Sequence, residues 1–226
     1  MLMPWSKQKI NIEAVIRILR RETRKFKVPI VSRIAQGASV QKPFLVLISC
    51  LLSLRTKDET TASASERLFN LAASPQEMLG LSVGQIEKAI YPVGFYRVKA
   101  RRIREICRTL INKFSSRVPD NLDELLNLKG VGRKTANLVL TEGFGKLGVC
   151  VDTHVHRITN RLGLCRTKNP EQTEFCLRNK LPKRYWIEYN TLLVAWGQNI
   201  CKPVSPLCTH CAIERYCRRI GVTTSR

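Results

Sequence analysis

The apolar residues of this chain recur at the three- and four-residue spacing of α-helices, and they almost never alternate with the two-residue period of strands. The helical spacing occupies residues 10–27, 43–54, 61–72, 97–114, 136–145, 153–164 and 184–197. Proline or glycine interrupts it at Ser74-Pro75, Tyr91-Pro92, Val118-Pro119, Asn169-Pro170, Leu181-Pro182 and Gly197. We therefore predict an all-α protein of about ten helices, in which the chain after Gly197 forms loops.

The charge of the chain indicates what kind of partner it binds. Its 226 residues include 39 Lys and Arg against 17 Asp and Glu, which gives a formal net charge of +22. A field of this sign attracts phosphates and repels other cations, so we expect a nucleic acid as the partner. A charged surface that only keeps the protein soluble is the plainer alternative, but such surfaces usually mix the two signs.

Nothing in the sequence indicates a membrane partner. No stretch reaches the roughly 18 apolar residues of a membrane span, and the N-terminus lacks the apolar block of a secretory signal. Residues 10–27 could pass for a basic transit sequence, yet Glu13, Glu22 and the apolar spacing suit a docked helix better. We expect a monomer in a prokaryotic cytoplasm, associated with the nucleoid, and no organelle targeting.

The chain has nine cysteines, an odd number that in this setting favours thiols and metal ligands over disulfides. Cys201, Cys208, Cys211 and Cys217 follow one another with gaps of six, two and five residues. Four thiolates suit an iron–sulfur cluster, whereas zinc sites more often use two C-x2-C pairs; zinc stays open as the alternative. We interpret the other five as core thiols: Cys50, Cys107, Cys150, Cys165 and Cys176.

A two-glycine turn lies in the segment LLNLKGVGRKTANLVL, residues 125–140. Gly130 and Gly132 let the backbone bend sharply and leave amide N–H groups at the start of the next helix, where an anion such as a phosphate can bind. The segment is no P-loop, because that motif needs Gly directly before Lys, whereas Arg133 precedes Lys134. A plain helix connection, with Lys134 on a solvated face, is the alternative interpretation.

Asp152 stands directly before the helical pattern of residues 153–164 and is a candidate N-cap. Capping alone, which contributes about 1 kcal/mol, would be enough to explain an aspartate there.

LKGVGRKTANLVL, then VDTHVHR, then the C-x6-C-x2-C-x5-C tail together resemble endonuclease III, of the helix-hairpin-helix DNA glycosylases. The resemblance runs from about Pro43 to Cys217 and implies a two-lobed, all-α glycosylase fold with the DNA cleft between the lobes. It implies a six-helix barrel lobe with the helix-hairpin-helix at residues 36–146, and an iron–sulfur cluster lobe from residues 1–35 and 147–226. It also implies that the four C-terminal cysteines hold a [4Fe-4S] cluster.

The resemblance implies a base-excision-repair enzyme, a bifunctional DNA glycosylase and AP lyase that removes oxidised pyrimidines. Its partner would be double-stranded DNA with a damaged base or an abasic site, and the damaged nucleotide would leave the base stack. Lys134 matches the family's nucleophile, which forms a Schiff base with the sugar before β-elimination cuts the strand 3′ to the lesion. Asp152 matches the carboxylate that stabilises positive charge on the sugar and helps to move protons.

The resemblance also indicates residues that would contact DNA. Phe95 would be the wedge that fills the gap left by the nucleotide, although a core aromatic is the alternative. Arg55 stands where many relatives carry Gln, which puts its readout of the opposite base in doubt, and Lys129 replaces the usual Pro of the hairpin. The full expected set is Arg55, Phe95, Arg97, Lys99, Gly130, Gly132, Arg133, His154 and Lys202.

Two other functions are compatible with the same fold. A monofunctional mismatch or adenine glycosylase is one, but those relatives usually lack the lysine. A non-catalytic DNA-binding module is the other, and the loss of Lys134 or Asp152 would have favoured it; both residues are present.

Overall fold

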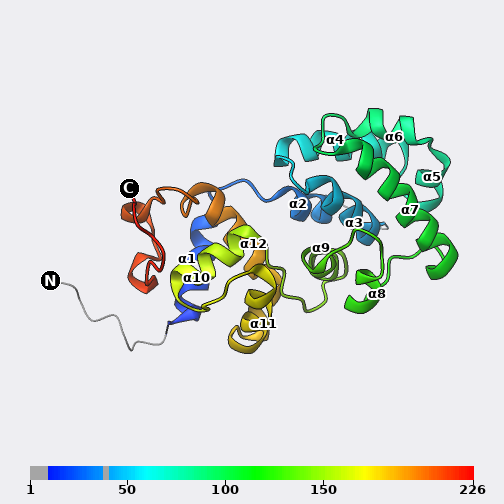
Figure 1. Ribbon diagram of the computed structural model, residues 1–226. Coiled ribbons are helices and arrows are strands. Elements are labelled where there is room, and N and C mark those ends of the chain that lie inside the picture. The colour runs from blue at the N-terminus through cyan, green and yellow to red at the C-terminus, as the bar shows by residue number, and fades with distance from the viewer. Residues whose placement is uncertain (1–9, 38–40) are drawn as a thin grey trace. The chain divides into compact units, whose positions relative to one another are not determined.

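The computed structural model describes residues 10–37 and 41–226 (Figure 1). Within these residues it contains twelve α-helices, one π-helical turn, three 3-10 turns and no strand, which confirms the all-α prediction. The described chain forms two compact units, which we call the middle unit (residues 29–37 and 41–148) and the terminal unit (residues 10–28 and 149–226). No helix in the described ranges is both long and apolar enough to cross a membrane.

The middle unit is built around α3 (Lys42–Ser53). Nearly all side chains from Phe44 to Leu52 are buried, because the run FLVLISCLL is apolar on every side of the helix. The α3 helix packs against α2, α4, α7, α9 and the π-helical turn. Around it lie α2 (Ile30–Gly37), α4 (Asp58–Leu71), α5 (Pro75–Gly80), α6 (Val83–Ile90), α7 (Tyr96–Phe114), α8 (Leu122–Leu126), α9 (Arg133–Leu138) and the π-helical turn (Val139–Gly143).

Polar caps fix several helix starts in both units. Ser74 and Ser82 begin α5 and α6 with capping boxes, in which Glu77 and Gln85 bind back to the amide of the cap residue. Asn169 caps α11 (Pro170–Lys180) by accepting a hydrogen bond from the amide of Gln172. These bonds satisfy amide groups that have no partner inside their own helix.

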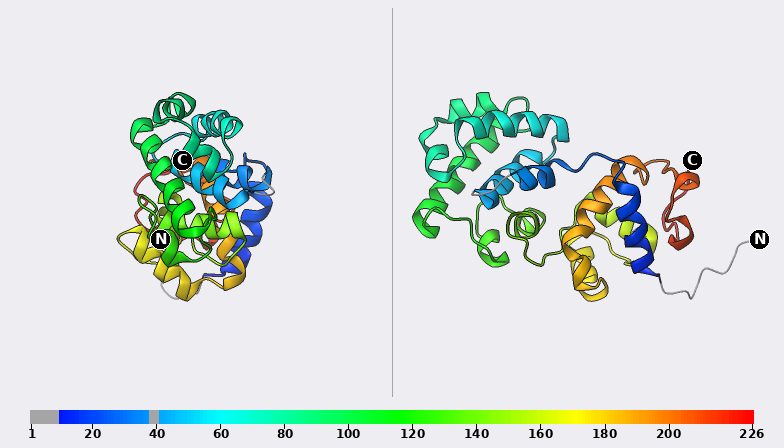
Figure 2. Two further views of the ribbon diagram at one scale, coloured as in Figure 1. Left: turned by 90° about the vertical axis from the view of Figure 1, so that its right-hand side faces the viewer. Right: turned by 180° about the vertical axis from the view of Figure 1, so that it is seen from behind.

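The terminal unit is formed by an N-terminal and a C-terminal part of the described chain. Helix α1 (Ile12–Thr23) packs against α12 (Trp186–Asn199), as Figures 1 and 2 show. Tyr189, Leu193 and Trp196 of α12 are buried in the core that these helices share with α10 (Thr153–Leu162). The remaining elements are α10 (Thr153–Leu162), α11 (Pro170–Lys180) and 3-10 turns at Lys183–Tyr185, Cys208–His210 and Glu214–Tyr216.

The division between the units differs from the one expected, which placed residues 36–146 in one lobe. The structure divides the chain after Val28 and after Gly148. The larger shift arises because residues 30–37 form α2, which packs against α3 and α4. The buried side chains of α2, among them Ile30, Val31 and Ala35, therefore belong to the core of the middle unit.

Two helices end at other places than the sequence predicts. The predicted break at Gly197 is wrong, because α12 continues to Asn199. Gly197 instead allows close packing, since a Cβ there would come within 2.3 Å of His154 Nδ1. The predicted helix at residues 136–145 is two elements, because α9 ends at Leu138 and the π-helical turn continues to Gly143.

Two cysteines interpreted as core thiols form a disulfide instead. Cys165, in the segment after α10, is bonded to Cys176 of α11, so that interpretation is wrong for this pair. Cys50, Cys107 and Cys150 are buried free thiols, as predicted. Burial raises the pKa of the Cys50 and Cys107 thiols to about 12, so they stay protonated and unreactive at neutral pH.

Replacing Gly197 with alanine should destabilise the protein by about 1–3 kcal/mol, because overpacking forces neighbours to move. The added Cβ would meet His154 at both Nδ1 (2.3 Å) and Cβ (3.0 Å). Urea unfolding followed by circular dichroism measures the change. Gly84→Ala in α6 is the matched control, since nothing lies within 4 Å of its added Cβ. An unchanged unfolding midpoint in Gly197→Ala would contradict the packing explanation.

Candidate functional site

The two-glycine turn connects α8 to α9. Gly130 has a φ of 86°, in the left-handed region that favours glycine, and a Cβ there would lie 2.9 Å from Arg102 Cδ. Gly132 is the N-cap residue of α9 and, as a glycine, has no side chain with which to cap the helix. An anion such as a phosphate can bind at a helix start of this kind, which is where the sequence predicts one.

Lys134 is the second residue of α9, and it is half-buried. Burial raises the pKa of the Cys50 thiol in α3 to about 12. The positive charge of Lys134 has the opposite, smaller effect and lowers the pKa of this thiol. The lysine is therefore close enough to the central helix of the middle unit to interact with one of its buried groups. This environment differs from the fully solvated face of the plainer interpretation.

Asp152 is the N-cap residue of α10, as predicted. Its Oδ1 accepts a hydrogen bond of 2.8 Å from the amide of Val155. The carboxylate is half-exposed, and its charge lies at a helix N-terminus, where anions are stabilised. Lys134 belongs to the middle unit and Asp152 to the terminal unit.

Arg55 and Phe95 lie beside each other in the middle unit, on two different loops. The Arg55 guanidinium lies over the Phe95 ring, 5.7 Å from its centroid. Both residues are exposed, Phe95 by 62%, so the alternative interpretation of Phe95 as a core aromatic is wrong. Both have a positive φ, 54° and 57°, which non-glycine residues rarely adopt.

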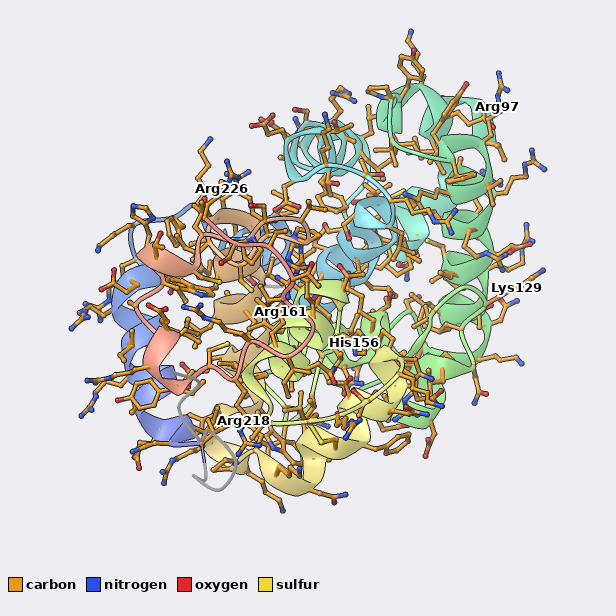
Figure 3. All side chains as sticks on the ribbon, turned by 60° about the vertical axis from the view of Figure 1, so that its left-hand side comes forward. Arg97, Lys129, His156, Arg161, Arg218 and Arg226 are labelled. Atoms are coloured by element: carbon orange, nitrogen blue, oxygen red, sulfur yellow. A yellow bond between two sulfur atoms is a disulfide. The ribbon has the colours of Figure 1, made fainter. Side chains whose placement is uncertain are left out.

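Of the cationic side chains at the start of α7, some are exposed and one is buried. Arg97 and Arg101 are exposed, and Figure 3 shows Arg97 at the start of this helix. Lys99 is only 8% exposed, and its ammonium donates hydrogen bonds to backbone carbonyls. The structure therefore gives Lys99 no access to a phosphate, contrary to the expected DNA contact. The signal was present in the sequence, since Lys99 shares helical spacing with Ile103, Ile106 and Leu110.

The four C-terminal cysteines lie around one cavity in the terminal unit. Cys201, Cys208, Cys211 and Cys217 all line it, together with apolar side chains such as Ile213. All four are half-buried free thiols. Burial raises the pKa of Cys211 and Cys217 to about 11, as expected for protonated sulfur atoms kept from water.

Hydrogen-bond donors that the sequence did not reveal surround these sulfur atoms. Arg161 of α10 donates to Cys201 Sγ at 3.3 Å, and the Arg219 amide donates to Cys217 Sγ at 3.4 Å. Arg161 also binds the carbonyls of Lys202 and Pro203, which ties α10 to the cysteine segment; Figure 3 labels it there. No spacing rule marks such an arginine, because its role depends on which loop folds over it.

The buried indole N–H of Trp196 lines the same cavity and has no oxygen or nitrogen acceptor among the described residues. It is near enough to the Cys211 thiol to lower its pKa, although burial outweighs this effect. No set of three or more described His, Cys, Asp or Glu side chains is arranged to hold a single metal ion. In a four-iron cluster, by contrast, each thiolate binds its own iron atom, so the residues present fit such a cluster.

The last two expected DNA contacts, His154 and Lys202, belong to the terminal unit. His154 Nδ1 lies 3.1 Å from the Arg157 guanidinium, which also binds the Cys201 carbonyl. Lys202 is half-exposed and directly follows Cys201. Both residues are therefore linked to the segment that carries the four cysteines.

Comparisons with known proteins agree with these features. Residues 48–183 match the model of the HhH-GPD superfamily base excision DNA repair proteins. Endonuclease III of Thermotoga maritima is 48% identical over 83% of this chain and 88% of its own length. The chain spans about half the length of two chloroplastic endonuclease III homologues of Arabidopsis thaliana that it also matches.

Two solved structures have the same fold. A non-covalent endonuclease III–DNA complex matches with a TM-score of 0.82 and 32% identity, over 94% of this chain and 96% of that one. A trapped endonuclease III–DNA covalent intermediate matches with a TM-score of 0.76 and 33% identity, over 92% and 96%. The chain therefore belongs to the endonuclease III family of the helix-hairpin-helix base excision DNA repair proteins.

Proposed function

We propose that this protein is a bifunctional DNA glycosylase and AP lyase that removes oxidised pyrimidines from duplex DNA. The observation that carries the proposal is a lysine, Lys134, in the first turn of α9, the helix that follows the two-glycine turn. In a chain of this family, an amine at that position is suited to attack a sugar whose phosphate binds the neighbouring amide groups. We also propose that the protein acts at the nucleoid of a prokaryotic cell.

The lysine chemistry proceeds in two stages. The neutral Lys134 amine attacks C1′ of the extruded nucleotide; the base leaves with the bonding electron pair, and the opened sugar becomes an imine of the lysine. Loss of a proton from C2′ then expels the 3′ phosphate oxygen, which breaks the strand by β-elimination. A monofunctional enzyme would need water rather than an amine at C1′, and nothing at Lys134 favours that alternative.

Asp152 would act on charge and protons rather than as the nucleophile. Its Oδ1 is fixed by the Val155 amide, which orients the carboxylate at the start of α10. A carboxylate in a fixed orientation stabilises the positive charge that develops on the sugar as the base leaves. It can also accept and return protons during ring opening.

DNA binding would use the N-terminal turn of α9 together with exposed arginines of α7. Arg133 would bind phosphate beside the amide groups, and Arg97 and Arg101 would follow the backbone. Phe95 and Arg55 would enter the gap left by the extruded nucleotide, since apolar side chains can separate stacked bases.

The four C-terminal cysteines would hold the [4Fe-4S] cluster that the family resemblance implies. The buried N–H of Trp196 and the Arg161 guanidinium would then donate to its sulfur atoms, as donors near such clusters commonly do. When bound, the cluster would cross-link a segment with little regular structure. Lys202 and the exposed arginines of this segment, Arg215, Arg218 and Arg219, would thereby be held in place for phosphate.

The Schiff base can be tested by borohydride reduction, which fixes an imine as a stable protein–DNA adduct. With duplex DNA that holds an oxidised pyrimidine, we expect the parent protein to be trapped and Lys134→Gln to give no adduct while still binding the duplex. Asp152→Asn should be trapped roughly 100-fold more slowly, because it loses charge stabilisation but keeps the nucleophile. Lys88→Gln, an exposed lysine of α6, is the control. Trapping of Lys134→Gln at the parental rate would assign the chemistry to another amine.

The cluster can be tested by metal analysis of the purified protein. We expect about four irons and four acid-labile sulfides per chain, with broad visible absorbance. Cys211→Ser should lose most of this iron, whereas Cys107→Ala, which removes a buried thiol of the middle unit, should keep it. A colourless protein with one zinc per chain would show that the alternative metal is correct.

The phosphate track can be tested by the salt dependence of binding. The logarithm of the association constant for a lesion duplex should fall against the logarithm of salt concentration with a slope of several units. Arg97→Gln should reduce that slope by about one, because it removes one phosphate contact. An identical slope in parent and variant would exclude Arg97 from the track.

A further inference from the structure

Lys99 uses a buried ammonium group to bind the end of another helix. Its Nζ donates to the Leu52 carbonyl (2.9 Å), the Leu54 carbonyl (2.6 Å) and Thr56 Oγ1 (3.3 Å). Leu52 lies in the last turn of α3, where carbonyl groups have no partner within the helix and carry partial negative charge. Burial lowers the pKa of Lys99 to about 8, so near neutral pH most of the group is protonated, with three donors for three acceptors.

Thr56 extends this contact to a second loop. Its hydroxyl donates to the Leu54 carbonyl at 3.2 Å and accepts from the amide of Gly94, also at 3.2 Å. The two backbones pass so closely that a Cβ at Gly94 would lie 2.7 Å from the Arg55 carbonyl oxygen. The loop after α3 and the loop before α7 are therefore joined through Lys99, Thr56 and the Gly94 backbone.

Arg55 directly follows Leu54, and Phe95 directly follows Gly94, so both lie next to the backbone that these hydrogen bonds hold. Each is exposed, each has a positive φ, and the guanidinium of one lies over the ring of the other. Residues persist in such a backbone conformation only where their surroundings impose it. Here the backbone beside Arg55 and Phe95 is held by hydrogen bonds: Lys99 and Thr56 both donate to the Leu54 carbonyl, and Thr56 accepts from the Gly94 amide. The far end of the second loop is also held, because Arg67 of α4 binds the Ala89 and Tyr91 carbonyls.

We propose that Lys99 and Thr56 are positioning residues that hold Arg55 and Phe95 as one preformed wedge. The inference rests on the proposed function, because a wedge is useful only to a protein that opens base pairs. A wedge that is ordered before DNA binds avoids the entropy loss of ordering two loops during binding. It also explains why a lysine is buried in the middle unit with two carbonyl oxygens and a hydroxyl as its acceptors, where an apolar residue would pack without losing hydration.

The test uses two substrates, of which only one needs a wedge. A duplex with an oxidised pyrimidine must be opened, whereas a single-stranded abasic oligonucleotide offers its sugar aldehyde directly. We expect Thr56→Val and Lys99→Met to cleave the duplex roughly 10- to 100-fold more slowly in single-turnover reactions, as small misplacements do. Borohydride trapping on the single-stranded abasic substrate should stay within about twofold of the parent, because Lys134 is unchanged.

Matched variants separate positioning from general damage. Thr56→Ser keeps the hydroxyl and should cleave the duplex at the parental rate, as should Lys113→Met, which removes an exposed lysine from the same α7. Fluorescence of 2-aminopurine opposite an abasic analogue should rise on binding of the parent and rise less with Thr56→Val, because the wedge unstacks this base.

The results test the proposed function and the positioning role of Lys99 and Thr56 separately. Failure of the parent to trap on single-stranded abasic DNA would overturn the proposed function. If the parent is trapped but Thr56→Val and Lys99→Met cleave the duplex at its rate, the positioning role is wrong. Loss of single-strand trapping together with duplex cleavage would also overturn it, because the residues would then support the fold and not the wedge.

Discussion

The burial of α3 is the interaction on which the functional parts of the middle unit depend. Each large apolar side chain of this helix contributes roughly 1.5–3 kcal/mol when it leaves water, and nearly all of those from Phe44 to Leu52 do so. The helix carrying Lys134 packs on α3, and the loop carrying Arg55 leaves its C-terminal end. A fixed central helix therefore gives both the proposed nucleophile and the proposed wedge a rigid base, which sites of this precision require.

In the terminal unit, the segment that carries the four cysteines has little regular structure and must be ordered by other contacts. Beyond α12 it contains only two short 3-10 turns, and few of its side chains are buried. Such a segment would open easily by itself. Arg161 opposes this by binding two of its carbonyls and one sulfur atom, and an iron–sulfur cluster would add four covalent cross-links to the same few residues. Helix, arginine and cluster would then act together to order one cationic surface.

The sequence predicts features that depend on periodicity or on short motifs. The helices, the Asp152 cap and the glycine turn are of this kind, because the chemistry that forms them is local. It does not predict features that depend on a distant neighbour. Gly197 looks like a helix end until His154 is seen to occupy the space of its Cβ, and the partner of Cys165 is visible only once α11 is in place. The roles of Lys134 and Asp152 are implied by the family resemblance, whereas the spacing of the four cysteines by itself favours an iron–sulfur cluster over zinc; all of these assignments stay predictions.

The net charge of +22 identifies the class of partner better than it identifies the residues that contact it. Several cations of this chain are committed to the protein itself: Arg67, Lys99, Arg157 and Arg161 all bind backbone carbonyls at helix ends or in loops. These groups still add to the long-range field that attracts DNA, because a buried or bonded cation keeps its charge. Lys99, the buried one of the four, gives no direct phosphate contact. A cationic residue can therefore serve DNA binding indirectly, by holding the loop on which an exposed residue reaches the duplex, and Lys99 beneath the Arg55–Phe95 pair is placed for that role.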